Sequence, residues 1–345
     1  TICDSSVNQT SGYIKAASGP TAPHYFFWLV ESKSDPVNDP LMMWLSGGPG
    51  CSSQLALFAE NGPCTVNEDG TGTTLNQYSW NAKANVMWVD QPAGVGFTTG
   101  LGTHNEAGVA SNMYTFLQGF YEKFPQYQNS PFYIFGESYG GHYVPAISHK
   151  IWENNKAGAG INIPLTGIAI GNGLTDPEEQ YKWYAEMGHG GGVPEGGHAP
   201  SVYSDALYNG MKAAEPACTE AIKVCAALPN PVTCLAASEG CNLAFQIPYR
   251  LTGQNPYDMR IKCEHGNLCY EFDPVGKYLN SASVQQELGV SNHWGSCNMA
   301  VNLMFQLAGD SMVPFHTMLV TDFMELSPTR FCTCSLDHKV IIWDS

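Results

Sequence analysis

A serine placed between two glycines is the residue of this sequence best suited to covalent chemistry. Ser138 is the centre of Gly136-Glu-Ser-Tyr-Gly140, which follows the apolar run Phe132–Phe135 and precedes a predicted helix. Where a strand turns sharply into a helix, the residues two before and two after such a serine must lack side chains. The hydroxyl is then held exposed, and the helix start adds positive potential. The pattern therefore predicts that Ser138 is a nucleophile for acyl transfer or hydrolysis.

Such chemistry also needs hydrogen-bond donors for the oxyanion that forms on the substrate. One donor is the backbone N–H after the nucleophile, which here belongs to Tyr139. The second is expected from a glycine-rich loop that follows an earlier strand. The apolar run Leu41–Leu45 and the loop Gly47-Gly-Pro-Gly50 supply that arrangement. The two motifs together predict an oxyanion hole.

The elements that must position these groups follow from the apolar pattern. Helical spacing of apolar residues predicts a helix over Ser111–Phe124. Strands that alternate with helices indicate an α/β fold with a doubly wound, mostly parallel sheet. Short apolar runs predict buried strands at Tyr25–Val30, Leu41–Leu45, Ala84–Val89, Phe132–Phe135 and Gly167–Ile170.

A cysteine-rich insertion interrupts this pattern between Tyr184 and Asn267. The pairs Cys218/Cys225 and Cys234/Cys241 each have the spacing of two helical turns, and Pro229-Asn-Pro231 forces a turn between them. An antiparallel helical hairpin would give the nested bridges Cys218–Cys241 and Cys225–Cys234, whereas a parallel arrangement would join Cys218 to Cys234. Nested bridges are favoured. Cys263 and Cys269 bracket a short loop and predict a local bridge. His189 and His198, also in the insertion, are interpreted as residues of flexible loops.

The composition of the sequence argues against several classes of function. The 345 residues include 31 acidic and 15 basic side chains, for a net charge of -16. The negative electrostatic field of such a chain repels nucleic acids and anionic membranes, so neither is expected as a partner.

The cysteines and the targeting signals bear on the compartment. The 12 cysteines indicate an oxidising compartment, and the absence of a CxxC pair argues against a zinc site. The sequence shows no secretory h-region and no apolar run long enough for a membrane span. Asn8-Gln-Thr10 is a glycosylation sequon, and neither a metal nor a cofactor is expected.

Longer motifs carry a family resemblance that runs from about Cys3 to about Phe323. The chain resembles the serine carboxypeptidases, exopeptidases of the α/β-hydrolase fold found in vacuoles, lysosomes and secretions. The motifs occur in order: WLSGGPGCSS (Trp44–Ser53), ENGPC (Glu60–Cys64), YSWN (Tyr78–Asn81), VDQPAGVGF (Val89–Phe97), GESYGGHYVPA (Gly136–Ala146), IGNGLTDP (Ile170–Pro177) and GSCN (Gly295–Asn298).

The resemblance implies a role for each matching residue. It implies that Ser138 is the nucleophile and that Gly48 and Tyr139 supply the oxyanion-hole N–H groups. It also implies a site for the C-terminal carboxylate of a peptide, and a bridge Cys51–Cys297 between the oxyanion loop and GSCN. Cys3–Cys64 is a further predicted pair. The carboxylate site would be formed by Trp44, Ser46, Gly47 and Glu137, with Glu60 paired to Glu137; the family usually has asparagine where this chain has Ser46.

The pair Glu60–Glu137 carries a physical consequence. Two neighbouring carboxyl groups in a partly buried site do not both ionise easily, so the pKa of one of them rises. In mild acid the pair shares a proton, and Glu137 can donate a hydrogen bond to the carboxylate of the substrate. Recognition of a free C-terminus and a preference for acid then have the same cause.

The rest of a catalytic triad is not visible in the sequence. His142 lies four residues after Ser138, on the predicted helix, whereas this fold places the aspartate and then the histidine later and far apart. His142 is therefore interpreted as a structural helix residue. The family patterns GDxD and AGHMVP do not occur. Asp310 and His316 precede the expected strand, and Asp337 and His338 are adjacent, so neither pair suits the two separated roles.

The predicted organisation has four parts. Residues 1–183 form the α/β-hydrolase core, 184–267 the cap insertion, 268–323 the return to the core and 324–345 a divergent tail; the last strands of the sheet are expected to be missing. The predicted function is a serine carboxypeptidase of the secretory pathway, lysosomal, vacuolar or secreted, that acts on peptide C-termini through an acyl-enzyme on Ser138. The alternative is a catalytically inactive homologue or truncated product. The sequence is compatible with a homodimer.

Overall fold

The computed structural model describes residues 2–190, 201–266, 268–313, 331–334 and 340–343. Several residues discussed above lie outside these ranges, namely His198, His316, Asp337 and His338. The same holds for most of the tail 324–345.

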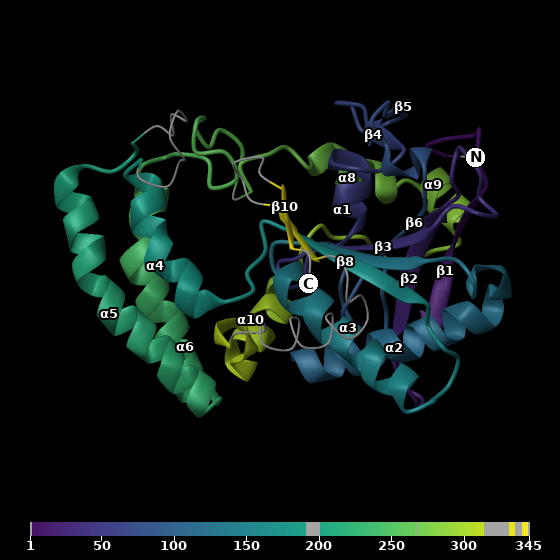
Figure 1. Cartoon of the computed structure of the whole chain (residues 1–345). Coiled ribbons are helices and arrows are strands. Elements are labelled where there is room, and N and C mark those ends of the chain that lie inside the picture. Colours follow the sequence, from purple (N-terminus) through teal and green to yellow (C-terminus); the bar gives the residue numbers. More distant parts are fainter. Residues whose placement is uncertain (1, 191–200, 267, 314–330, 335–339, 344–345) are drawn as a thin grey trace.

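A six-stranded mixed sheet forms the centre of the molecule (Figure 1), in the order β1-β2-β6-β3-β7-β8. β1 and β2, and β2 and β6, pair antiparallel, while the pairs β6–β3, β3–β7 and β7–β8 are parallel. The fold is the predicted α/β arrangement with a mostly parallel sheet. The strands in sheet order are β1 (Gln9–Lys15), β2 (His24–Val30), β6 (Asn85–Val89), β3 (Leu41–Leu45), β7 (Phe132–Glu137) and β8 (Leu165–Gly171).

Five of the six strands coincide with the predicted apolar runs, and β1 is the one that was missed. Its sequence QTSGYIK is only partly buried, because β1 is an edge strand that pairs with β2 alone among the described strands. An edge strand carries a weak apolar signal, since one side of it faces solvent. On the opposite side β8 is the outermost strand among the described residues, and the hairpin β9 (Phe331–Cys334) with β10 (Val340–Trp343) forms a sheet of its own.

Helices cover both faces of the sheet and bury two hydrophobic clusters. On one face lie α2 (Glu106–Lys123) and α3 (Gly140–Lys156), and on the other α1 (Gln54–Ala59), α8 (Asp273–Leu279) and α9 (Ala282–Leu288). α2 starts five residues before its predicted start. The Asn105 side chain accepts the Gly108 N–H at 2.8 Å, so it caps the helix, which the apolar spacing alone did not indicate.

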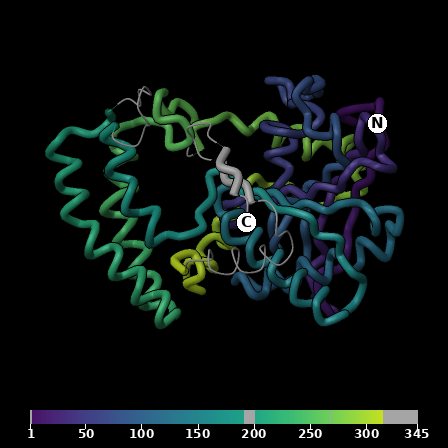
Figure 2. Tube along the Cα trace, viewed as in Figure 1, coloured from purple at the N-terminus to yellow at the C-terminus, as the bar shows by residue number. Residues whose placement is uncertain are grey.

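The insertion between β8 and α8 is helical and stands to one side of the sheet (Figures 1 and 2). Its bridges Cys218–Cys241 and Cys225–Cys234 are nested, as the spacing predicted, so α5 and α6 form an antiparallel hairpin. Buried side chains of α4, α5 and α6 form a third hydrophobic cluster. The helices are α4 (Pro177–Gly188), α5 (Asp205–Ala227), α6 (Pro231–Cys241), the π-helix η3 (Asn242–Gln246) and α7 (Ile247–Leu251).

His189 lies in the turn that follows α4, as the loop prediction required. His189 caps the end of α4, and its ring stacks on Tyr208 with the centroids 4.3 Å apart. Its Nε2 lies 2.8 Å from a carboxylate oxygen of Asp205. These contacts join the turn after α4 to α5.

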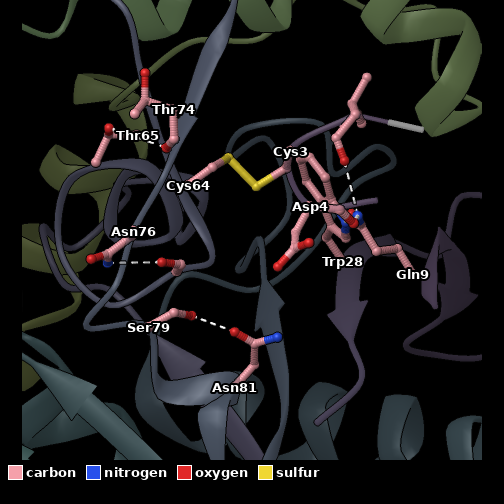
Figure 3. The surroundings of a disulfide bond; sticks show 12 residues. Cys3, Asp4, Gln9, Trp28, Cys64, Thr65, Thr74, Asn76, Ser79 and Asn81 are labelled. Carbon is pink, nitrogen blue, oxygen red and sulfur yellow. Dashed lines mark hydrogen bonds between the residues drawn. A yellow bond between two sulfur atoms is a disulfide. The ribbon is translucent and has the colours of Figure 1, made fainter. Parts of the chain in front are cut away.

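Five disulfides agree with the predicted pairs, the three outside the hairpin being Cys3–Cys64, Cys51–Cys297 and Cys263–Cys269. Figure 3 shows Cys3 joined to Cys64 beside Gln9 and Trp28, whose indole N–H donates to Gln9 at 3.0 Å. The bridge fastens the N-terminal segment to β4 (Cys64–Val66), which pairs with β5 (Thr73–Leu75). A bridge of this kind typically stabilises a fold by about 2–4 kcal/mol.

The remaining elements are short. They are η1 (Trp80–Ala82), η2 (Pro125–Tyr127), α10 (Met299–Ala308) and η4 (Asp310–Met312). In the part of the chain that the structure describes, none of the helices has the length and apolar character needed to span a membrane.

Candidate active site

Ser138 lies at the turn between β7 and α3, with the positive φ of 58° and an exposed side chain. A non-glycine residue rarely adopts this backbone conformation, so neighbouring groups must hold it. The Ser138 N–H donates to the Gly171 carbonyl at 3.0 Å, and the Ser138 carbonyl accepts the N–H of Leu174 at 2.9 Å. A Cβ on Gly136 would lie 2.5 Å from Cγ2 of Val144, which explains the glycine two residues before the serine. The predicted elbow is present.

The loop after β3 lies against this turn. A Cβ added to Gly47 would lie 2.8 Å from both the Glu137 carbonyl oxygen and the Ser138 Cβ, and closer still to the Tyr139 nitrogen. Gly48 has a φ of +116°, and a Cβ there would lie 2.7 Å from the Gly50 nitrogen. The loop backbone therefore contacts the backbone at the nucleophile directly. This is the juxtaposition that two convergent N–H donors require.

A buried aspartate, Asp90, fixes the far end of that loop. Its Oδ1 accepts the Ser52 hydroxyl at 2.6 Å and the Ser53 N–H at 3.1 Å, and its Oδ2 accepts the Phe97 N–H at 2.9 Å. Burial raises the pKa of Asp90 to about 6, although these hydrogen bonds oppose the rise. The motif VDQPAGVGF supported the family resemblance, but nothing in its spacing indicated that Asp90 would contact Ser52 and Ser53.

Glu60 and Glu137 are interacting carboxyl groups, and Glu137 directly precedes the serine of the elbow. Desolvation and the charge of Glu137 raise the pKa of Glu60 to about 8, and desolvation raises the pKa of Glu137. Glu60 is exposed and Glu137 is half-buried, so water screens part of this effect. The pKa of both glutamates is raised. The pair therefore holds a proton above the pH at which an isolated carboxyl group loses it.

Trp44 lies in β3 and Ser46 directly follows that strand, which pairs with β7. The Trp44 indole N–H donates to the Ser46 hydroxyl oxygen at 3.3 Å, and the Ser46 N–H donates to the Ser53 hydroxyl oxygen at 3.1 Å. Because the Ser46 oxygen accepts from Trp44, its own O–H is directed elsewhere as a donor. The Trp44 ring meets the Trp80 ring edge-on at 5.4 Å. The end of β3, with Trp44, Ser46 and Gly47, thus lies beside the end of β7 that carries Glu137.

His142 does not have the surroundings of a catalytic base. It is fully buried in α3, its ring stacks on Tyr139 at 4.7 Å, and it is hydrogen-bonded to the backbone of Leu174. Burial lowers the pKa of His142 to about 4. The interpretation as a structural residue therefore agrees with its environment. Asp310 accepts the Glu106 N–H at 2.6 Å, so it contacts the first turn of α2.

Tyr257, in the insertion, is a neighbour of the site that the sequence did not single out. Burial and the charge of Glu137 raise the pKa of its hydroxyl, which places Tyr257 in the electrostatic field of the glutamate pair. Its ring lies 5.9 Å from the ring of Tyr270. No cluster of three or more His, Cys, Asp and Glu side chains able to hold a metal ion occurs within the described ranges.

Comparison with known proteins gives consistent results. A family model described as serine carboxypeptidase matches residues 3–328. The chain is 43% identical over 316 residues to a carboxypeptidase Y homolog A of Ajellomyces dermatitidis, covering 91% of this chain and 56% of that protein. It is 42% identical over 326 residues to the homolog of Sclerotinia sclerotiorum, covering 93% of this chain and 57% of the relative. The chain therefore spans a little over half the length of these relatives.

A solved structure resembles the fold over most of the chain. It is that of Kex1(delta)p, a prohormone-processing carboxypeptidase from Saccharomyces cerevisiae, with a TM-score of 0.78 and 23% sequence identity. The likeness covers 92% of this chain and 72% of the other. At this identity the comparison supports the α/β-hydrolase architecture.

Proposed function

Because the chain belongs to the serine carboxypeptidase family, we propose that it removes C-terminal residues from peptides through an acyl-enzyme on Ser138. The observation that carries this proposal is the serine elbow at Ser138, with the backbone of Gly47 packed directly against it and Glu137 beside it. Two carboxyl groups that share a proton form a site for a third carboxylate, the one that distinguishes the end of a peptide from its interior.

The reaction follows from the arrangement. The Ser138 oxygen attacks the carbonyl carbon of the last peptide bond, and the N–H groups of Gly48 and Tyr139 stabilise the negative charge on the carbonyl oxygen. The serine proton passes to a base and then to the departing amine, which leaves as the C-terminal amino acid. Water hydrolyses the ester that remains and restores Ser138. His142 is not that base, because it is buried in α3 and burial lowers its pKa.

Recognition of the substrate is assigned to the cluster around Ser46 and Glu137. In mild acid Glu137 donates the shared proton to the substrate carboxylate, and the Ser46 hydroxyl and the Gly47 backbone supply further contacts. Ser46 is shorter than the asparagine usual in the family, so a water molecule is expected to bridge part of the gap. Residues 184–267 are proposed as a cap over this site.

The experiment that tests the function compares a peptide with its C-terminal amide. At about pH 5 the free acid is expected to bind at least about tenfold more tightly, because its charged carboxylate accepts the shared proton more strongly than the carbonyl of an amide does. Isothermal titration calorimetry measures this without requiring turnover. Equal affinity for acid and amide would exclude a carboxypeptidase-type site. The alternative, an inactive homologue that binds peptides, gives the same acid preference but no reaction at Ser138.

We also propose that the chain passes through the secretory pathway and carries a glycan at Asn8. The five disulfides support an oxidising compartment. Asn8 and Thr10 of the sequon are both exposed. On expression in eukaryotic secretory cells, N-glycosidase is expected to reduce the mass of the chain but not that of Asn8→Gln. An unchanged mass of the parent chain would contradict the assignment.

A further inference from the structure

An asparagine on α10, Asn302, contacts the loop that carries the second oxyanion donor. Its Nδ2 donates to the carbonyl oxygens of Gly48 and Pro49, both at 3.2 Å. Its Oδ1 accepts the side-chain amide of Gln306 at 2.9 Å. This set of partners fixes the orientation of the Asn302 amide, because an exchange of O and N would place an acceptor against two carbonyls.

The contact constrains the peptide groups around Gly48. The φ of +116° at Gly48 belongs to a region that glycine visits freely, so the residue has little conformational preference of its own. Hydrogen bonds to the carbonyls of Gly48 and Pro49 restrict rotation on one side of the loop. On the other side, Gly47 lies directly against the elbow. The Gly48 N–H lies between these two points of attachment.

Other contacts attach α10 itself to the loop. The Asn298 N–H donates to the Gly50 carbonyl at 2.8 Å, and the bridge Cys51–Cys297 joins the segment before α10 to the end of the loop. The N-terminal turn of α10 therefore moves with the loop. Asn302 is the residue through which this turn reaches Gly48.

We propose that Asn302 is a positioning residue for the oxyanion hole: its amide sets the orientation of the Gly48–Pro49 segment and so aims the Gly48 N–H. The proposal rests on the proposed function, in which Gly48 supplies that donor. Asn302 touches no reacting atom, and its effect is on the stabilisation of the tetrahedral state. Binding of a ground-state ligand at Ser46 and Glu137 is independent of it.

The test measures two quantities on the full chain and its variants. The first is the rate at which a fluorophosphonate modifies Ser138, with Ser138→Ala as the blank. The second is the dissociation constant of N-acetylphenylalanine. Since loss of one oxyanion donor costs about 100- to 1000-fold in rate, we expect displacement of Gly48 to slow modification about tenfold in Asn302→Ala and about 100-fold in Asn302→Asp. The dissociation constant is expected to change less than about twofold.

Asn292→Ala is the matched control. Asn292 is also a half-buried asparagine whose Nδ2 donates to a backbone carbonyl, that of Phe97 at 3.0 Å, but it is not in contact with the oxyanion loop. Its replacement is expected to leave both quantities unchanged. Modification of Asn302→Ala and Asn302→Asp at the parent rate would overturn the proposal and leave the proposed function standing. A parallel loss of ligand binding would also overturn it, because it would show a general structural role. Failure of the parent chain to react at Ser138 would overturn the proposed function itself.

Discussion

Replacement of Gly47 by alanine is expected to slow modification of Ser138 by a fluorophosphonate at least about 100-fold, the cost of losing one or more oxyanion donors. The added methyl group would lie 2.8 Å from the Ser138 Cβ and from the Glu137 carbonyl oxygen, and inside contact distance of the Tyr139 nitrogen. Backbone atoms cannot rotate away as a flexible side chain does. The loop or the elbow must shift, and the donors of Gly48 and Tyr139 then no longer converge.

Gly295→Ala provides the control for this substitution. Gly295 lies in the neighbouring GSCN motif, and a Cβ there would meet no atom within 4 Å. The same chemical change is therefore expected to be neutral for the labelling rate and for thermal unfolding. A labelling rate of Gly47→Ala equal to that of Gly295→Ala would show that the loop and the elbow do not contact each other as described.

The carboxyl pair gives the second large effect, a change in the pH dependence of ligand binding. As pH rises through about 8, Glu60 loses the proton that the pair shares, and two negative charges then face the ligand carboxylate. The affinity of the parent chain for N-acetylphenylalanine is therefore expected to fall at least about tenfold between about pH 5 and about pH 9. The affinity for the amide is expected to stay constant.

Two substitutions separate the roles of the partners. In Glu137→Gln the amide can donate to the ligand at every pH, and the pKa of Glu60 falls because its charged neighbour is gone, so the fall in affinity near pH 8 is expected to disappear. In Glu60→Gln the remaining carboxyl has no partner to share a proton, so its pKa falls and it repels the ligand already in mild acid. Glu239→Gln, at an exposed position of α6, serves as the control. An unaltered pH profile in both pair variants would contradict the assignment of the proton to Glu60 and Glu137.

How far the sequence predicts this structure depends on where the determining contacts lie. The strands β3 and β7 carry continuous apolar runs because both faces are covered, and they were predicted with nearly correct bounds. The bridges of the insertion follow from cysteine spacing on two helices, which is local information. β1 was missed because an edge strand needs less apolar surface. The start of α2 was missed because a cap depends on a single polar side chain.

The residues of the site differ in the same way: some were predictable from local sequence motifs, and others depend on contacts between distant parts of the chain. The nucleophile and the oxyanion loop lie in contiguous motifs, where the need for glycine at a close approach leaves a visible pattern. Asp90 and Asn302 are tied to the loop by contacts across 38 and 254 residues, respectively, and no local spacing records such contacts. The shared proton of Glu60 and Glu137 was inferred from the family resemblance, and in the structure desolvation and the charge of Glu137 raise the pKa of Glu60.

The most direct measurement of whether this site is catalytic is the location and rate of phosphonylation in the 345-residue chain. The chain is treated with a fluorophosphonate at about pH 5, digested and examined by mass spectrometry, in the presence of N-acetylphenylalanine or its amide. Ser138 is expected to be the single modified residue, and the acid is expected to slow its modification while the amide does not. Modification at another residue, or equal protection by acid and amide, would contradict the account of Ser138 as the nucleophile of a carboxylate-recognising site.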